Sequence, residues 1–172
     1  MAERHLREEA SQDQADKILI KQFSTKSEAE TEELGFRLGK MLKTGDVVAL
    51  NGELGAGKTH FTSGVAKSIG ISSHITSPTY TIVNEYTEGE VLLMHFDTYR
   101  LTCGDDLYDI GFDDYLARKG IIIIEWAENV DDALPENTIK VNIKRHDSEG
   151  ENLRTIEIEF PEGDERNDSF GI

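Results

Sequence analysis

The chain has 172 residues with 34 acidic and 18 basic side chains, and its formal net charge is −16. This length suits one domain with a hydrophobic core, and the excess of carboxylates argues against direct binding to DNA, RNA or an anionic membrane, because phosphate groups are held by many lysines and arginines. Cys103 is the only cysteine and no apolar run could cross a bilayer, so we expect no internal disulfide, no membrane attachment and a cytoplasmic location.

The N-terminal part of the chain begins with polar residues and then turns to regular patterns. Residues 1–16 are rich in charged and amide side chains with no apolar period, which predicts a flexible acidic extension. Residues 18–23 alternate apolar and polar side chains, as in a strand with one buried face. Ser27 and Glu30 have the spacing of a capping box, so a helix is predicted to begin there. The apolar side of this helix consists of Leu34, Leu38, Met41 and Leu42.

The most informative stretch is a phosphate-binding loop, G-x-x-x-x-G-K-[ST], at residues 52–59. The apolar run 47–50 leads directly into it, and an amphipathic helix that ends at Gly70 follows it. Glycines let successive backbone N–H groups turn toward a polyphosphate, and the following helix points its positive dipole end at the same anion. In such a loop Lys58 reaches the β and γ phosphates and the Thr59 hydroxyl binds Mg²⁺. The residues predicted to contact the nucleotide are Gly52, Glu53, Leu54, Gly55, Ala56, Gly57, Lys58 and Thr59.

Beyond this unit, the chain predicts a hairpin and a short acidic helical region. The hairpin is expected from residues 81–86 and the apolar run 91–96, with a turn between them. The helical region runs from residue 105 to residue 119 and is interrupted at Gly111.

The C-terminal third predicts the remaining strands of the sheet. The apolar run 121–124 suits a strand that is buried on both faces, as in a parallel sheet covered by helices. Residues 138–144 and 154–160 are predicted to be two antiparallel edge strands. We therefore expect one α/β domain at residues 17–160, with a P-loop NTPase-like, mostly parallel sheet flanked by helices and antiparallel edge strands, and a flexible C-terminal tail at 161–172.

Two acidic residues at strand ends are candidates for nucleotide hydrolysis. Asp97 and Glu125 each follow an apolar strand, and ligands gather at the carboxyl ends of strands in open α/β sheets. Hydrolysis requires that Mg²⁺ is held and that a water molecule is oriented, although a strand-terminal acid can also cap a helix or face solvent. Arg100 is the nearest candidate for stabilising transition-state charge and could equally be structural. The histidines His60, His74 and His95 do not have the spacing of zinc ligands. We therefore expect them to be ordinary polar residues.

Four separated segments together resemble the TsaE (YjeE) family. They are Gly-Glu-Leu-Gly-Ala-Gly-Lys-Thr at 52–59, Ser-Pro-Thr-Tyr at 77–80, His-Phe-Asp-Thr-Tyr-Arg-Leu at 95–101 and Ile-Glu-Trp-Ala-Glu at 124–128. Members of this family are small bacterial P-loop ATPases that are needed to make threonylcarbamoyladenosine, a modified nucleoside beside the anticodon of tRNA. The resemblance spans about residues 24–160 and therefore covers most of the chain.

The resemblance implies roles for individual residues. Residues 53–58 would wrap the phosphates of ATP, and Thr59 and Glu125 would hold Mg²⁺. Trp126 corresponds to a family tryptophan beside the nucleotide, and residues 77–80 correspond to a switch-like segment near the γ-phosphate. The implied catalytic residues are Lys58, Asp97 and Glu125.

The resemblance also implies protein partners. TsaE-like proteins resemble weak ATPases that act on a complex of TsaB and TsaD, so tRNA would be reached only through that complex. Two other functions remain open on the residues alone, a small-molecule kinase and a noncatalytic ATP-sensing module. A GTPase is disfavoured because the base-reading motif N-K-x-D is absent from the sequence.

Overall fold

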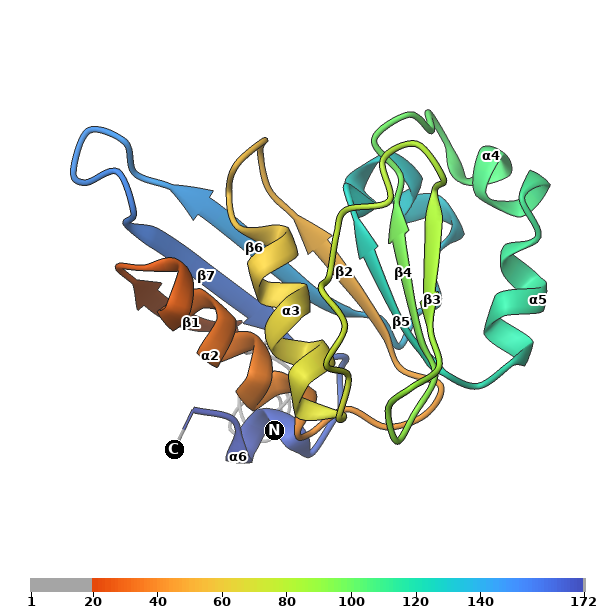
Figure 1. Ribbon diagram of the computed structural model, residues 1–172, viewed down its shortest axis with the longest axis horizontal. Coiled ribbons are helices and arrows are strands. Elements are labelled where there is room, and N and C mark those ends of the chain that lie inside the picture. Colours follow the sequence, from red (N-terminus) through yellow and green to blue (C-terminus); the bar gives the residue numbers. More distant parts are fainter. Residues whose placement is uncertain (1–19, 172) are drawn as a thin grey trace, which may run out of the picture.

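The computed structural model describes residues 20–171, which form a single mixed sheet with helices on both faces (Figure 1). The strands are β1 (Ile20–Thr25), β2 (Val47–Asn51), β3 (Val83–Tyr86), β4 (Leu93–Asp97), β5 (Ile121–Glu125), β6 (Ile139–Arg145) and β7 (Arg154–Glu159). They lie in the order β1-β7-β6-β2-β5-β4-β3. The central strands β6, β2, β5 and β4 are parallel, whereas β7, β1 and β3 join in antiparallel pairs. The predicted α/β fold, with a parallel centre and antiparallel edges, is confirmed.

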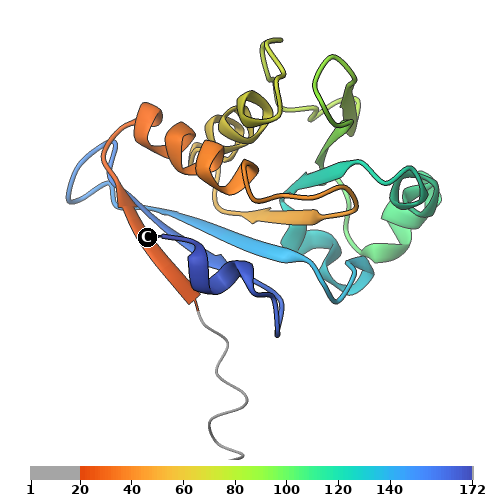
Figure 2. The same cartoon turned by 90° about the horizontal axis from the view of Figure 1, so that it is seen from below.

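Helices cover the two faces of this sheet. They are α2 (Glu28–Gly39), α3 (Lys58–Ser68), α4 (Gly104–Asp109), α5 (Phe112–Ala117), the 3-10 segment η1 (Ala127–Ala133) and α6 (Arg166–Ser169). Figure 2 shows α2 and α3 side by side on one face and η1 on the opposite face. In β5, Ile121 and Ile123 belong to the core cluster that includes α2 and α3, and Ile122 and Ile124 belong to the cluster of α4, α5 and η1. Strand β5 is therefore buried on both faces, as predicted.

Local sequence signals mark the element boundaries correctly. Ser27 caps α2, because its hydroxyl accepts a hydrogen bond from the Glu30 amide at 3.1 Å. The Glu30 carboxylate in turn accepts from the amide of Lys26 at 2.7 Å, one residue before the position in a standard capping box. Helix α3 is followed by Gly70 at φ +84°, and Gly111 at φ +85° separates α4 from α5. The predicted hairpin is the antiparallel pair β3 and β4.

Strands β6 and β7 pair with each other as predicted, but neither is an edge strand. β6 lies between β2 and β7, and the edges of the sheet are β1 and β3. Alternating polarity suggested an edge because every second side chain of β6, such as Lys140 and Asn142, is only partly buried. One partly exposed face produces this alternation in an interior strand as well as at an edge.

The C-terminal residues 161–171 pack against the domain, in contrast to the flexible tail that the sequence predicts. Phe170 is 2 % exposed and its ring centroid lies 5.4 Å from that of Phe23 and 5.6 Å from that of Phe160. Arg166 donates hydrogen bonds to the carboxylates of Asp46 and Asp164. Phe170 and Arg166 thus attach the otherwise polar segment 161–171 to the rest of the domain.

Part of the predicted organisation lies outside the described residues. This applies to the extension at 1–16 and to the first residues of the predicted strand at 18–23. Among residues 20–171, none of the helices combines the length and the apolar character that a membrane crossing requires.

Candidate functional site

The loop between β2 and α3 presents unpaired backbone amides to a cavity of about 480 Å³. Gly57 precedes α3 at φ +110°, a conformation that favours glycine, and no side chain caps the helix. The amides of Lys58, Thr59 and His60 have no protein acceptor among residues 20–171. Free amides at a helix N-terminus attract an anion, and the cavity is within the size range of small-molecule sites.

Lys58 lies across this loop. Its ammonium donates to the carbonyl oxygens of Gly52 and Glu53, the second at 3.0 Å, and sits 4.0 Å from the centroid of the Trp126 ring. Burial lowers the pKa of Lys58 below its ordinary value of 10.5, and the nearby carboxylate of Glu125 opposes this shift. An ammonium has three donors, so one N–H remains for a ligand in the cavity.

The Glu125 carboxylate is the centre of a buried hydrogen-bond network at the end of β5. Its Oε1 accepts from the Thr59 hydroxyl at 3.1 Å and lies 2.9 Å from His95 Nε2. Its Oε2 lies 3.3 Å from the Ser77 hydroxyl, whose single proton has its shorter contact, 2.6 Å, with Asp97. Glu125 is 3 % exposed and His95 is fully buried. The structure therefore brings together the predicted pair Thr59 and Glu125, and it adds His95, which the sequence presented only as an ordinary polar residue.

Asp97 lies beside Glu125 because β4 and β5 are parallel and these two residues are in register. Its Oδ2 accepts from the hydroxyls of Ser77 at 2.6 Å and Thr79 at 3.0 Å, and its Oδ1 accepts from the amide of Tyr99 at 2.9 Å. The segment at 77–80 is thus attached to the carboxylate that the sequence identified as a catalytic candidate.

The donor set fits a magnesium ion that is shared with a nucleotide. Mg²⁺ prefers oxygen ligands, keeps several waters and is held in proteins by one or two carboxylates together with substrate phosphates. The Thr59 hydroxyl and the Glu125 carboxylate offer such oxygens beside the free amides. Within the described part of the chain, no group of three or more His, Cys, Asp or Glu side chains could hold a metal ion unaided.

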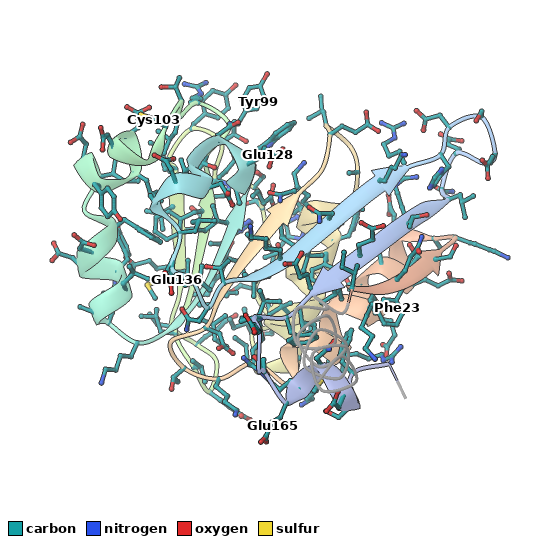
Figure 3. All side chains as sticks on the ribbon, turned by 180° about the vertical axis from the view of Figure 1, so that it is seen from behind. Phe23, Tyr99, Cys103, Glu128, Glu136 and Glu165 are labelled. Carbon is teal, nitrogen blue, oxygen red and sulfur yellow. The ribbon has the colours of Figure 1, made fainter. Side chains whose placement is uncertain are left out.

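Trp126 lines the same cavity. Its backbone has φ +58°, and its carbonyl accepts from the Thr98 hydroxyl at 2.7 Å. The rings of Tyr99 and Trp126 are tilted, with centroids 5.0 Å apart. Tyr99 and Glu128, which is two residues after Trp126, both lie at the end of the sheet where the loop is found (Figure 3).

Some residues are placed differently from what the sequence suggested. Arg100 lies with its guanidinium 4.6 Å from the ring centroid of Tyr80 and does not line the cavity. Arg154 and Asn152, from the opposite end of the chain, do line it, and neither stood out in the sequence. No spacing rule could have found them, because the β6–β7 hairpin brings them to the loop.

Comparisons with known proteins agree with this geometry. The family model of the threonylcarbamoyl adenosine biosynthesis protein TsaE matches residues 25–156. The TsaE protein of Bacillus subtilis is 39% identical over 123 residues, which cover 72% of this chain and 77% of the relative. The TsaE protein of Treponema pallidum is 40% identical over 120 residues, which cover 70% of this chain and 88% of the relative.

A solved structure is also similar. The crystal structure of Bacillus subtilis YdiB superposes with a TM-score of 0.73 at 31% identity, covering 89% of this chain and 92% of that one. Three findings agree: the family model matches most of the chain, the relatives have similar sequences, and the fold is shared. The chain belongs to the TsaE family of threonylcarbamoyl adenosine biosynthesis proteins.

Proposed function

We propose that this protein binds and hydrolyses Mg-ATP in support of tRNA threonylcarbamoyladenosine biosynthesis. The observation that carries the proposal is that one cavity joins the free amides of the loop, the Lys58 ammonium and the carboxylates of Asp97 and Glu125. An anion-binding loop without acids would support nucleotide binding alone. Two oriented carboxylates beside the loop favour hydrolysis.

The residues of the site would divide the work among them. The free amides of Gly55 and of residues 57–60, together with the spare N–H of Lys58, would bind the phosphates of ATP, and Thr59 and Glu125 would hold Mg²⁺. When bound, Mg²⁺ supplies positive charge that offsets the charge on the β and γ phosphates. Asp97 would orient the attacking water, because the three hydrogen bonds that it accepts hold its carboxylate in one direction.

The partners would be TsaB and TsaD, with tRNA reached through them. Leu54 and Tyr99 line the cavity and are 81% and 58% exposed, and Tyr80, which follows the lining residue Thr79, is 83% exposed. Such side chains suit a protein contact. The segment at 77–80 is bonded to Asp97, so a nucleotide that changes these bonds would also move Tyr80.

The catalytic part of the proposal is tested by Lys58→Ala. Phosphate release from ATP is expected to fall by about 100-fold or more, the loss that follows removal of a transition-state donor, while the circular dichroism spectrum is unchanged. Lys67→Ala is the matched control, because Lys67 lies on the same helix and pairs with Glu32 at the surface. Undiminished phosphate release by Lys58→Ala would remove the proposed site, and a phosphorylated small molecule in place of free phosphate would indicate a kinase.

The partner coupling is tested by a pull-down with TsaB and TsaD in the presence of ATP or of ADP. A ligand shifts a conformational equilibrium only by its difference in affinity for the two states. We therefore expect different amounts of captured complex with the two nucleotides. Equal capture would contradict the coupling and leave the hydrolysis result standing.

A further inference from the structure

Two arginines reach the phosphate loop from the β6–β7 hairpin. Arg145 at the end of β6 and Arg154 at the start of β7 stand directly opposite each other in the antiparallel register. Like charges at such positions destabilise a sheet unless other contacts compensate. Arg145 has an ion pair with Asp147 at 2.9 Å, whereas Arg154 has no carboxylate partner among residues 20–171.

The guanidinium groups bind carbonyl oxygens of the loop instead. Arg145 Nη1 donates to the oxygen of Leu54 at 3.2 Å. Arg154 Nε donates to the oxygen of Ala56 at 2.9 Å, and its Nη2 donates to the oxygen of Gly55 at 3.3 Å. Three consecutive carbonyl groups of the loop are thus held by two side chains from a distant part of the chain.

The position of these carbonyls determines where the neighbouring amides point. In a trans peptide unit the C=O of one residue and the N–H of the next point in opposite directions, and residues 20–171 contain no cis peptide bond. Holding the oxygens of Leu54 and Ala56 therefore turns the N–H groups of Gly55 and Gly57 away from the arginines. Both amides lack a protein acceptor among the described residues, and both glycines line the cavity.

Two further donors of Arg154 anchor it to its own hairpin. Its Nη1 donates to the carbonyl oxygens of Glu151 at 2.9 Å and Leu153 at 3.0 Å. The planar guanidinium thus connects the hairpin turn to the phosphate loop through four carbonyl groups. A lysine ammonium could not reproduce this arrangement, because it has three donors on one nitrogen.

We propose that Arg145 and Arg154 are positioning residues, which hold the phosphate loop in the conformation that presents the Gly55 and Gly57 amides to a polyphosphate. The consequence for ATP rests on the proposed function, whereas the effect on the loop belongs to the nucleotide-free protein. The role depends on the shape of the guanidinium and not on its charge alone.

Lysine substitutions separate shape from charge. In the full-length protein, Arg154→Lys and Arg145→Lys are each expected to lower the binding affinity for both Mg-ADP and Mg-ATP by about 10-fold. This is the low end of the loss in affinity that follows removal of an orienting partner at metal sites. Trp126 is the only tryptophan and lines the cavity, so its fluorescence can follow the titrations. KM for ATP is expected to rise more than kcat falls. Arg118→Lys is the control, since Arg118 forms a bidentate pair with Glu85 away from the loop.

A second readout does not depend on nucleotide. In ¹⁵N NMR spectra of the nucleotide-free protein, the Gly55 and Gly57 amide signals are expected to shift or broaden in Arg154→Lys and to stay in place in Arg118→Lys. If the wild-type protein bound no nucleotide, the proposed function would fail, and these signals would still decide whether the arginines position the loop.

Two results would overturn the inference. One is wild-type nucleotide affinity in both lysine variants, which would show that charge alone suffices. The other is an unchanged pair of glycine signals in Arg154→Lys. If Arg154→Lys did not fold, Arg145→Lys would decide the matter by the same criteria, because Arg145 is 29% exposed and contacts the loop through one hydrogen bond.

Discussion

At the scale of single residues, the site depends on the polar groups that surround one buried carboxylate. Glu125 is 3 % exposed, and a buried carboxylate is costly unless donors surround it. Polar side chains reach it from three different segments, through Thr59 on α3, Ser77 in the segment before β3 and His95 on β4. These contacts surround both carboxylate oxygens and also fix the orientation of the carboxylate toward the loop.

The charge of Glu125 can be removed without removing its shape. Glu125→Gln keeps an oxygen for hydrogen bonds and loses the negative charge that would hold Mg²⁺. We expect Mg-dependent phosphate release to fall by about 100-fold or more, and the nucleotide-dependent effect on TsaB and TsaD to be lost with it. Glu85→Gln on strand β3 serves as the control. Intact partner regulation by Glu125→Gln would instead support a noncatalytic ATP sensor.

At the scale of elements, helices α2 and α3 pack at a backbone-to-backbone distance that only glycine permits. A Cβ atom on Gly35 would lie 2.1 Å from the carbonyl oxygen of Phe61, and one on Gly64 would lie 1.9 Å from that of Glu32. Backbone oxygens cannot move aside as a flexible side chain can. This contact sets the position of α3, whose first turn lines the cavity.

The contact between α2 and α3 predicts that a glycine-to-alanine substitution lowers the stability of the protein, the opposite of its usual effect in a helix. Alanine in a helix is normally more stable than glycine by about 1 kcal/mol. Here Gly64→Ala is expected to lower the free energy of unfolding by about 1–3 kcal/mol, because the added methyl forces the two helices apart. Urea denaturation measures the change, with Ser63→Ala as a control that stays within about 0.5 kcal/mol. A Gly64→Ala protein that equals or exceeds the wild type in stability would contradict the packing.

At the scale of the whole molecule, the C-terminal segment connects the outer part of the sheet to the strand that leads to the site. Phe23 on β1 and Glu165 just before α6 lie on the side of the molecule where the chain ends (Figure 3). Arg166 donates to Asp46, which directly precedes β2, and to Asp164. The side chains of all three are no more than 15% exposed, so their charges depend on one another.

This ion cluster predicts a pH-dependent contribution to stability. The hydrogen bond from Arg166 lowers the pKa of Asp164 below its ordinary value of 3.8. A lowered pKa in the folded state stabilises the protein above pH 3.8, and this stabilisation is lost as the pH falls through the folded-state pKa. Arg166→Gln is therefore expected to cost about 2 kcal/mol at neutral pH, the typical value of charged hydrogen bonds, and less in acid.

Urea denaturation of wild type and Arg166→Gln between neutral and acidic pH measures this difference. Lys144→Gln, which removes an exposed cation that has no ion pair among residues 20–171, is expected to change little at any pH. A difference between wild type and Arg166→Gln that stays constant through the acidic range would refute the linkage to Asp164.

The features that the sequence predicted well are those that neighbouring residues determine. The Ser27 cap, the break at Gly111 and the strand–loop–helix arrangement around residues 52–59 each depend on backbone geometry within a few positions. The two-sided burial of β5 follows from the uninterrupted apolar run at 121–124 in the same way. The placement of Asp97 beside Glu125 was also predictable, because the carboxyl ends of parallel strands meet at one edge of a sheet.

By itself, then, the sequence determined the α/β class, the loop and the strand-terminal acids, because these follow from local backbone preferences and from the alternation of apolar and polar residues. Only the tertiary structure decided that β6 lies inside the sheet, that Phe170 closes the core, that His95 supports Glu125 and that Arg154 holds the loop. Each of the latter contacts joins residues at least 30 positions apart or depends on which strands pair. Such pairings result from burial of the shared hydrophobic core, to which residues from many parts of the chain contribute together. They therefore cannot be predicted from any single stretch of the sequence.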